Sequence, residues 1–336
     1  MFEFIIAADL GSSYTRLASR TRLKSDETRV ALDPANSNRV LAVGREAGEL
    51  LNATSVYPVR GTIANVTLCA LMLRRFSLDM LKRHTLAGAG LRIASPFDVS
   101  STELSAALEV GREAGFTETR IVDGALAGAI GAGVDIGSPE ANLTVNIGRD
   151  RISAIVTANG GVLKRACAPF GSSAFDSRIQ AHFAMEHSTL ISFYAAEKIK
   201  KELKTPLLRV HGKDSATGQP LMRAVRTREI IEASEPVMRR FAAFLTSVIG
   251  DLHPDAAADL LDTGVTLIGG GANMYLMPES LERLLGIPVK RASNAESAVI
   301  LGMRRGMRLL AGPEAEKISG IGFSRSPKGF LGGQSM

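Results

Sequence analysis

The chain has 336 residues, of which 45% are hydrophobic and 5% aromatic, and its formal net charge is +6. This length predicts two domains with a substantial core, and the lack of an 18-residue apolar run argues against a membrane-spanning helix. No dense basic run with interleaved aromatic residues occurs, so we expect no nucleic-acid partner. The positive charge suits an anion such as a nucleotide or a membrane surface.

A strand begins within a few residues of the start, so we expect no signal peptide and a cytoplasmic location. Two cysteines, Cys69 and Cys167, lie in apolar surroundings without metal-ligand spacing. We expect both to be reduced core residues.

The first predicted strand, Phe4–Leu10, ends in an acid, a glycine and several hydroxyl residues. This pattern predicts a β-hairpin. Its tip presents backbone N–H groups and hydroxyls that suit phosphate oxygens, while Gly11 permits close backbone approach. Asp9 would hold Mg²⁺ through water. Ordinary hairpins share this pattern, so the stretch alone leaves a purely structural turn equally open. The candidate ligand-binding residues of the tip are Asp9, Gly11, Ser12, Ser13, Tyr14 and Thr15.

The rest of the first half alternates predicted strands and helices. A helix of small residues at 124–133 should pack very closely, against a sheet or a ligand. The other expected elements are strands over 18–32, 41–44, 91–96 and 119–122, a turn over 33–39, and helices over 45–51, 65–82 and 101–114.

The segment 141–156 repeats the design of the first hairpin, with a tip at Asn146, Gly148 and Arg149. A similar unit opening each half suggests duplication, with two lobes facing each other across a cleft. A later strand, Val265–Ile268, ends in Gly269, Gly270 and Gly271, which would let the backbone lie against a base or an α-phosphate. Two hairpin tips and one glycine turn are what a nucleotide between two lobes would need.

The remaining periodic segments of the second half complete an alternating pattern of strands and helices. Beyond Gly312 the composition predicts disorder. The expected elements are helices over 173–185, 190–203, 227–249, 256–262, 277–285 and 295–310, a hairpin over 206–225 and a strand over 288–291.

Taken in order, these motifs resemble the actin superfamily and, within it, the bacterial MreB family of rod shape-determining proteins. The resemblance covers roughly residues 4–310. The segments that carry it are Asp9–Thr15, Gly44–Ala47, Pro58–Ala64, Gly131–Gly133, Phe170–Asp176, Ala196–Glu202, His253–Asp262 and Leu267–Ala272.

The resemblance implies an α/β, two-lobed actin-like fold, with duplicated ribonuclease H-like domains around a nucleotide cleft. Lobe I would span 1–140, with a small subdomain at about 33–64. Lobe II would span 141–312, with a small subdomain at about 177–245. A tail would follow at 313–336.

The same resemblance implies ATP and Mg²⁺ as cofactors. Glu197, Lys200 and the glycine turn through Ala272 would contact the base, ribose and α-phosphate, although Glu197 and Lys200 could instead form a solvated pair on a helix face. Asn146, Gly148 and Arg149 would form the second phosphate loop.

The sequence departs from the family pattern at the catalytic positions. The second loop of the family reads Asp-Ile-Gly-Gly-Gly-Thr, whereas this chain has Asn146 to Arg151, and the arginines would obstruct the β- and γ-phosphates. The family's catalytic glutamate falls at Gly124, with Asp123 as a weak neighbouring candidate. General-base help is worth about 10²–10⁴ in rate, so we expect feeble or absent ATP hydrolysis. Arg149 either neutralises phosphate in place of a metal or fills a cleft that binds no nucleotide.

The resemblance implies a filament of self-associated subunits, or of this chain with an MreB paralogue, in cell-shape control at the inner membrane surface, where cell-shape membrane proteins would be partners. Leu86, in a loop preceded by basic residues, would insert into that membrane, although a plain surface loop is equally open. The alternative function is a nucleotide-independent pseudo-actin scaffold. A sugar or acetate kinase is disfavoured because no carboxylate base lies near Gly124.

Overall fold

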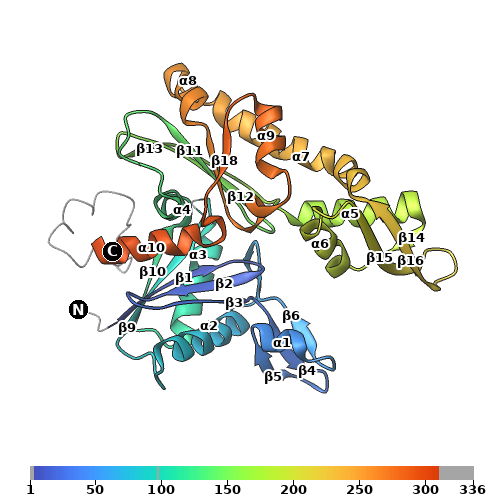
Figure 1. Ribbon diagram of the computed structural model, residues 1–336. Helices are drawn as coiled ribbons and strands as arrows, with labels where there is room; N and C mark the ends of the chain where they lie inside the picture. Colours follow the sequence, from blue (N-terminus) through green and yellow to red (C-terminus); the bar gives the residue numbers. More distant parts are fainter. Residues whose placement is uncertain (1–3, 97, 310–336) are drawn as a thin grey trace, which may run out of the picture.

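The computed structural model describes residues 4–96 and 98–309, and the predicted tail at 313–336 lies outside them. Two lobes, each built on a five-stranded mixed sheet, lie on either side of a central helix (Figure 1). A smaller arm extends from each lobe toward the same side of the molecule. The fold is therefore the two-lobed α/β architecture that the repeat predicted.

The sheet of lobe I has the order β10-β9-β1-β2-β3. Strand β1 pairs antiparallel with β2 and parallel with β9. Helices α2 and α3 pack against this sheet, and the side chains of Asn65 and Ser100 cap their N-termini. The bounds are β1 (Phe4–Leu10), β2 (Tyr14–Ala18), β3 (Leu23–Glu27), β9 (Ala89–Ser95), β10 (Glu118–Asp123), α2 (Val66–Leu81) and α3 (Ser101–Ala114).

The sheet of lobe II has the corresponding order β13-β12-β11-β17-β18, with β11 antiparallel to β12 and parallel to β17. Each sheet is thus a three-stranded meander extended by two parallel strands, which confirms the predicted duplication. The bounds are β11 (Asn142–Ile147), β12 (Ile152–Ala158), β13 (Gly161–Ala168), β17 (Val265–Ile268), β18 (Val289–Arg291), α8 (Pro254–Thr263) and α9 (Met277–Leu285).

Two helices, α4 (Gly124–Ala132) and α10 (Ala298–Leu309), cross between the sheets. A Cβ atom on Gly131 would lie 1.7 Å from the carbonyl oxygen of Ala298, and one on Gly302 would lie 1.7 Å from that of Ala127. The two backbones therefore touch at reciprocal glycines. The small-residue helix packs closely as predicted, but its closest partner is another helix.

The arm of lobe I is a three-stranded sheet, β5-β4-β6, with a short helix and a two-stranded hairpin beside it. The predicted turn at 33–39 is wrong, because β5 begins at Asn36 and pairs with β4. The bounds are β4 (Val30–Asp33), β5 (Asn36–Val43), α1 (Arg45–Glu49), β6 (Thr54–Val56), β7 (Val59–Arg60) and β8 (Thr62–Ile63).

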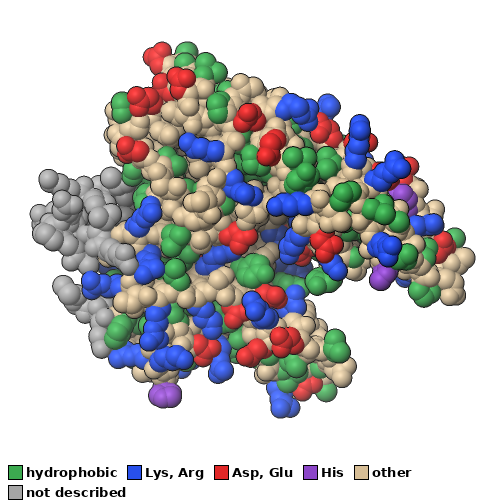
Figure 2. All heavy atoms as spheres, in the orientation of Figure 1, with side chains coloured by type: hydrophobic (Ala, Val, Ile, Leu, Met, Phe, Trp, Pro, Cys, Tyr) green, Lys and Arg blue, Asp and Glu red, His purple; other side chains and the backbone are tan. Residues whose placement is uncertain are grey.

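The arm of lobe II contains the sheet β14-β15-β16, helices α5 and α6, and the first turns of the long helix α7. The bounds are α5 (Ser173–His187), β14 (Thr189–Leu190), α6 (Phe193–Lys201), β15 (Leu207–Asp214), β16 (Pro220–Arg226) and α7 (Thr227–Gly250). Outside this arm, two 3₁₀ turns follow β17 and precede α10, at η1 (Gly270–Asn273) and η2 (Ala295–Ser297). Figure 2 shows a notch between the two arms, with basic and acidic side chains interspersed over this face.

The proposed membrane residue Leu86 is buried, with only 1% of its surface exposed, and belongs to the core of lobe I. Lys82 ends α2 in the left-handed conformation, and Leu86 in the loop that follows belongs to the same core cluster as Leu73 and Phe76 of α2. The prediction that Leu86 inserts into a membrane is therefore wrong for this conformation. None of the helices in the described part of the chain is long and apolar enough to span a bilayer.

Candidate functional site: a cleft between two hairpin tips

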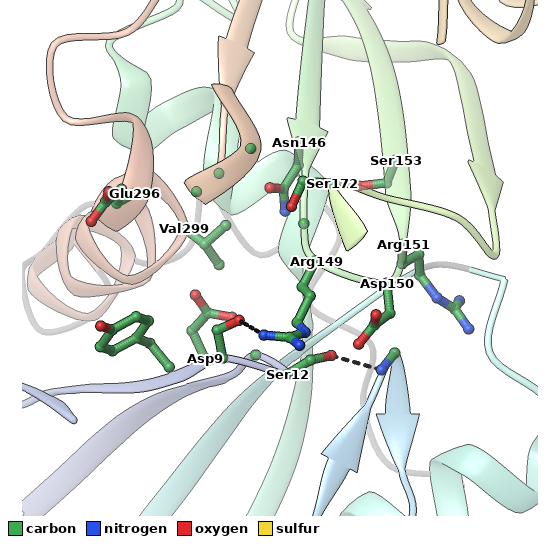
Figure 3. Close-up of a pocket in the computed structure, with 18 of the residues that line it drawn as sticks. Asp9, Ser12, Asn146, Arg149, Asp150, Arg151, Ser153, Ser172, Glu296 and Val299 are labelled. Atoms are coloured by element: carbon green, nitrogen blue, oxygen red, sulfur yellow. Dashed lines mark hydrogen bonds between the residues drawn. The ribbon is translucent and has the colours of Figure 1, made fainter. Parts of the chain in front are cut away.

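A cavity of about 420 Å³ lies between the lobes. Its walls come from the tips of the β1–β2 and β11–β12 hairpins, the glycine turn after β17, the start of α4, and α6 (Figure 3). The volume is within the range of about 300–1,000 Å³ typical of small-molecule sites. The sequence motifs identified in both halves therefore converge on one site.

The first tip is held by backbone and side-chain hydrogen bonds. The Gly11 N–H donates to the Tyr14 carbonyl over 3.1 Å, and a Cβ atom on Gly11 would lie only 2.8 Å from that oxygen. Ser12 Oγ accepts a 2.7 Å hydrogen bond from the N–H of Gly61, at the tip of the β7–β8 hairpin. Thr15 does not line the cavity, because it is buried and bonds Thr28 behind the tip. The turn therefore requires glycine, and the arm of lobe I supports it.

Asp9 lies at the end of β1 beside the cavity. Burial raises the pKa of its carboxyl group above the usual range, and the charge of Arg16 offsets only part of that rise. A buried carboxylate that lacks full compensation is stabilised by a cation, and Mg²⁺ prefers such oxygen ligands together with water. Asp9 therefore fits the metal-holding role predicted for it.

The second tip has the same backbone turn as the first. The Gly148 N–H donates to the Arg151 carbonyl over 2.9 Å, and a Cβ atom on Gly148 would lie 2.8 Å from that oxygen. Asn146 occupies the position that corresponds to Asp9 and also lines the cavity. Because an amide carries no charge, the second tip does not offer at this position the anionic ligand that Asp9 offers at the first.

Arg149 extends from the second tip across the cavity toward the first (Figure 3). Its Nη1 lies 3.4 Å from Ser13 Oγ and 3.5 Å from Glu197 Oε2, and its guanidinium lies 4.9 Å from the centre of the Phe193 ring. Both polar distances are long for charge-assisted contacts. The side chain is thus held weakly, at a place where a phosphate could offer it better partners.

The side chain of Arg151 points away from Asp9 and Ser12 of the first tip (Figure 3). Its guanidinium lies 2.9 Å from Asp98 and 3.3 Å from Glu103, the acid of the capping box at the start of α3. Arg151 lines the cavity but does not reach across it as Arg149 does, and its effect on the β- and γ-phosphates stays a prediction. This arginine ties the second tip to lobe I.

Lys200 and Glu197 lie on α6 at the other end of the cavity. Lys200 pairs with the fully buried Asp176 at 2.7 Å and donates to the Ser172 carbonyl over 3.1 Å. Burial raises the pKa of Asp176 and lowers that of Lys200, while their mutual attraction opposes both shifts. Glu197 pairs with Lys201 rather than with Lys200. The alternative of a solvated Glu197–Lys200 pair is therefore excluded.

The glycine turn closes the cavity between these two groups. Gly269 has φ of 85°, and a Cβ atom there would lie 2.3 Å from Asn146 Oδ1. Gly271 is equally crowded by Ile147, whereas nothing lies within 4 Å of a Cβ on Gly270. Gly270 therefore presents bare backbone to the cavity, while Ala272 is fully buried and does not line it.

Asp123 does not point into the cavity. Its Oδ1 accepts hydrogen bonds from the N–H groups of Ala125 and Leu126, and its Oδ2 lies 2.9 Å from Arg165 Nε on β13. Both oxygens are thus engaged in capping α4 and joining it to lobe II. Gly124, the neighbouring cavity residue, offers no acid or base, so the described cavity wall has no carboxylate at this position.

Sequence reasoning missed several residues that shape the site. Gly61 and Asp176 lay within motifs that had been noticed, but no pattern indicated that one supports Ser12 and the other pairs with Lys200. Glu296 was not identified at all. It lies 3.7 Å from Arg16 and accepts a 2.6 Å hydrogen bond from Asn273, so it fixes the rim beside Asp9.

Two lobes that carry equivalent hairpin tips around one cleft define an actin-like protein. A family model described as MreB/Mbl protein matches residues 4–311. The chain therefore belongs to the MreB/Mbl family.

Curated relatives and solved structures agree with this assignment. The chain is 27% identical to the cell shape-determining protein Mbl of Bacillus subtilis, over 90% of this chain and 95% of Mbl. It is 25% identical to the cell shape-determining protein MreB of Escherichia coli, over 92% and 95%. MreB 5 of Spiroplasma citri bound to AMPPNP superposes with a TM-score of 0.86 at 20% identity, covering 95% of this chain and 99% of that one. A MamK double helical filament gives a TM-score of 0.75 at 17% identity, covering 91% and 98%.

Proposed function

We propose that this chain is a nucleotide-binding, filament-forming cytoskeletal protein of cell-shape determination whose ATP hydrolysis is weak or lost. The observation that carries the proposal is the cavity itself, because both tips, the bare backbone of Gly270 and the half-buried Asp9 face it. Structures of MreB 5 with AMPPNP and with ADP support nucleotide binding in this fold. The names of the curated relatives support the role in cell shape.

In this proposal the nucleotide controls the closure of the two lobes. The hydroxyls of Ser12 and Ser13 and the backbone of both tips bind the phosphates, and the Asp9 carboxylate would hold Mg²⁺. Arg149 leaves Ser13 and Glu197 to contact phosphate with its planar fork. When bound, Mg²⁺ would neutralise phosphate charge. Because Asp123 is engaged elsewhere and Gly124 carries no side chain, nothing at that wall activates an attacking water.

The test is calorimetry of ATP binding with and without Mg²⁺. We expect micromolar binding by the unmodified protein, weakened at least tenfold by Asp9→Ala in the presence of Mg²⁺ and by Arg149→Ala in either condition. Arg112→Ala is the control, because this exposed arginine pairs with Glu109 within α3 and does not line the cavity. Binding that is unaffected by Asp9→Ala would contradict the proposed site. ATP-dependent sedimentation of filaments would then test the link from binding to assembly.

A second candidate function is a nucleotide-independent scaffold that co-assembles with an MreB paralogue. This alternative is favoured because charged side chains of the cavity already pair with other side chains of the same chain. Arg149 contacts Glu197, and Lys200 pairs with Asp176. No ATP binding, together with sedimentation in the presence of a paralogue, would establish this alternative. A place at the inner membrane surface stays a prediction, and the buried Leu86 gives it no support.

A further inference from the structure

A second group of ligand-type side chains lies in the arm of lobe II. His182 and His187 come from the last turns of α5, and Glu229 comes from the first turn of α7. Glu229 Oε1 lies 2.9 Å from His182 Nε2 and 2.6 Å from His187 Nε2, and all three atoms lie within 4.8 Å of one another. Among residues 4–96 and 98–309 this is the one such convergence of three His, Cys, Asp or Glu side chains.

The two imidazole rings aim their Nε2 atoms at the same oxygen. Their planes are inclined by 79° with centroids 5.4 Å apart, so they approach the common point from different directions. Phe183 contacts both rings and restricts their movement. Two rigid nitrogen donors that converge at different angles correspond to two vertices of a coordination polyhedron.

The third donor is both charged and movable. Burial acts to raise the pKa of Glu229, but the hydrogen bonds and charges of His182 and His187 outweigh it, and the net shift is downward. Glu229 is therefore an anionic carboxylate at neutral pH. Its side chain is 38% exposed, against 10% for His182 and 23% for His187, so it can withdraw toward solvent while the rings stay in place.

We propose that His182, His187 and Glu229 form a binding site for a divalent transition-metal ion, with Zn²⁺ as the preferred ion. Two imidazole nitrogens and one carboxylate oxygen are a donor set that zinc accepts, with water as a fourth ligand. The ion would lie near the point on which both rings converge, about 2.0–2.1 Å from each nitrogen, and Glu229 would retreat to coordinate it. The ion would join the end of α5 to the start of α7, and it would do so independently of any nucleotide.

The competing interpretation is a hydrogen-bonded cluster in which both histidines donate their Nε2–H to Glu229. Calorimetry of the untagged full chain with ZnCl₂ in excess Mg²⁺ distinguishes the two, because Mg²⁺ saturates sites that consist only of oxygen ligands. We expect one Zn²⁺ per chain, and at least a tenfold loss of affinity in His187→Gln. The glutamine amide can still donate to Glu229, so the metal-free fold should survive, which circular dichroism would verify.

His211→Gln is the matched control, since His211 is an exposed residue on β15 of the same arm. It should leave Zn²⁺ affinity unchanged. Glu229→Gln gives a second variant that keeps an acceptor oxygen and removes the charge, and it should also weaken Zn²⁺ binding at least tenfold. Equal affinity in all four proteins, or no Zn²⁺ binding by the unmodified chain, would overturn the proposal.

Discussion

The two hairpin tips share a backbone and differ in their chemistry. At each tip a glycine N–H donates to the carbonyl three residues later, at 3.1 Å for Gly11 and 2.9 Å for Gly148. A Cβ atom on either glycine would lie only 2.8 Å from that carbonyl oxygen, which is too close. The first tip then presents two serines, whereas the second presents Arg149, Asp150 and Arg151. The turn is thus fixed by a steric requirement that the neighbouring side chains need not share.

The side chains of the second tip are engaged by other parts of the protein. Arg149 reaches Ser13, Asp150 accepts a 2.9 Å hydrogen bond from Ser173 Oγ, and Arg151 reaches Asp98 on lobe I. In the first tip, Ser12 Oγ accepts a hydrogen bond from the Gly61 N–H, and Ser13 Oγ has, among the described residues, only the long 3.4 Å contact with Arg149. The difference shows that the second tip makes more side-chain contacts with the rest of the protein than the first, including the Arg151 contacts that connect the lobes.

The largest expected effect concerns the helix crossing that both lobes share. In Gly302→Ala the new methyl group would meet the Ala127 carbonyl, so α4 and α10 must separate. We expect a loss of about 3 kcal/mol in the free energy of unfolding, the upper part of the usual cost of overpacking. Urea denaturation measures it. Gly250→Ala is the control and should not destabilise the protein, because nothing lies within 4 Å of the new atom. A comparable loss of stability in Gly250→Ala would show that the effect at Gly302 does not come from the close contact of α4 and α10.

The second prediction tests the connecting role of the second tip. Arg151→Met keeps most of the side-chain volume but leaves Asp98 and Glu103 without their cation. Because the arginine is only 19% exposed, we expect a loss of about 1–2 kcal/mol. The difference from the unmodified protein should shrink in high salt, which screens partly exposed pairs. Arg112→Met, which removes an exposed pair within α3, should change stability little. A similar loss of stability in both variants would contradict the connecting role of Arg151, because its ion pairs would then contribute no more than an exposed pair within one helix.

The third prediction concerns the electrostatic cost of removing the Asp9 carboxylate from water at the first tip. Because burial raises the pKa of Asp9, its charged form destabilises the nucleotide-free fold, and Asp9→Asn should stabilise that fold by about 1 kcal/mol at neutral pH. The sign follows from linkage, since a raised pKa in the folded state means that stability falls as the pH rises through it. The gain should therefore shrink as the pH is lowered and Asp9 becomes protonated. Thermal unfolding of both proteins across pH measures this, and a gain that grows toward acid would contradict it.

The sequence predicted most of the strands and helices and the convergence of both tips with the glycine turn, because hydrophobic periodicity and glycine placement are local signals. It was wrong over 18–39, where the structure has β3, β4 and the start of β5 in place of one strand and a turn. It could not predict where long side chains turn. Arg149 and Arg151 are two residues apart, yet one enters the cavity and the other leaves it, and their partners lie far away in sequence. Leu86 was misjudged for the same reason, since its burial depends on packing in the core of lobe I against residues that are distant in the sequence.

The smallest expected effect distinguishes a structural carboxylate from a catalytic one. Asp123 caps α4 and contacts Arg165, and Asn can keep the cap through its side-chain oxygen. Asp123→Asn should therefore cost only about 0.5 kcal/mol, the scale of one weak ion pair, whereas Asp123→Ala should cost about 1 kcal/mol more through the lost cap. Phosphate release from ATP should be the same in all three proteins. A fall of tenfold or more in Asp123→Asn, with stability preserved, would mean that Asp123 leaves Arg165 and acts in the cleft after all.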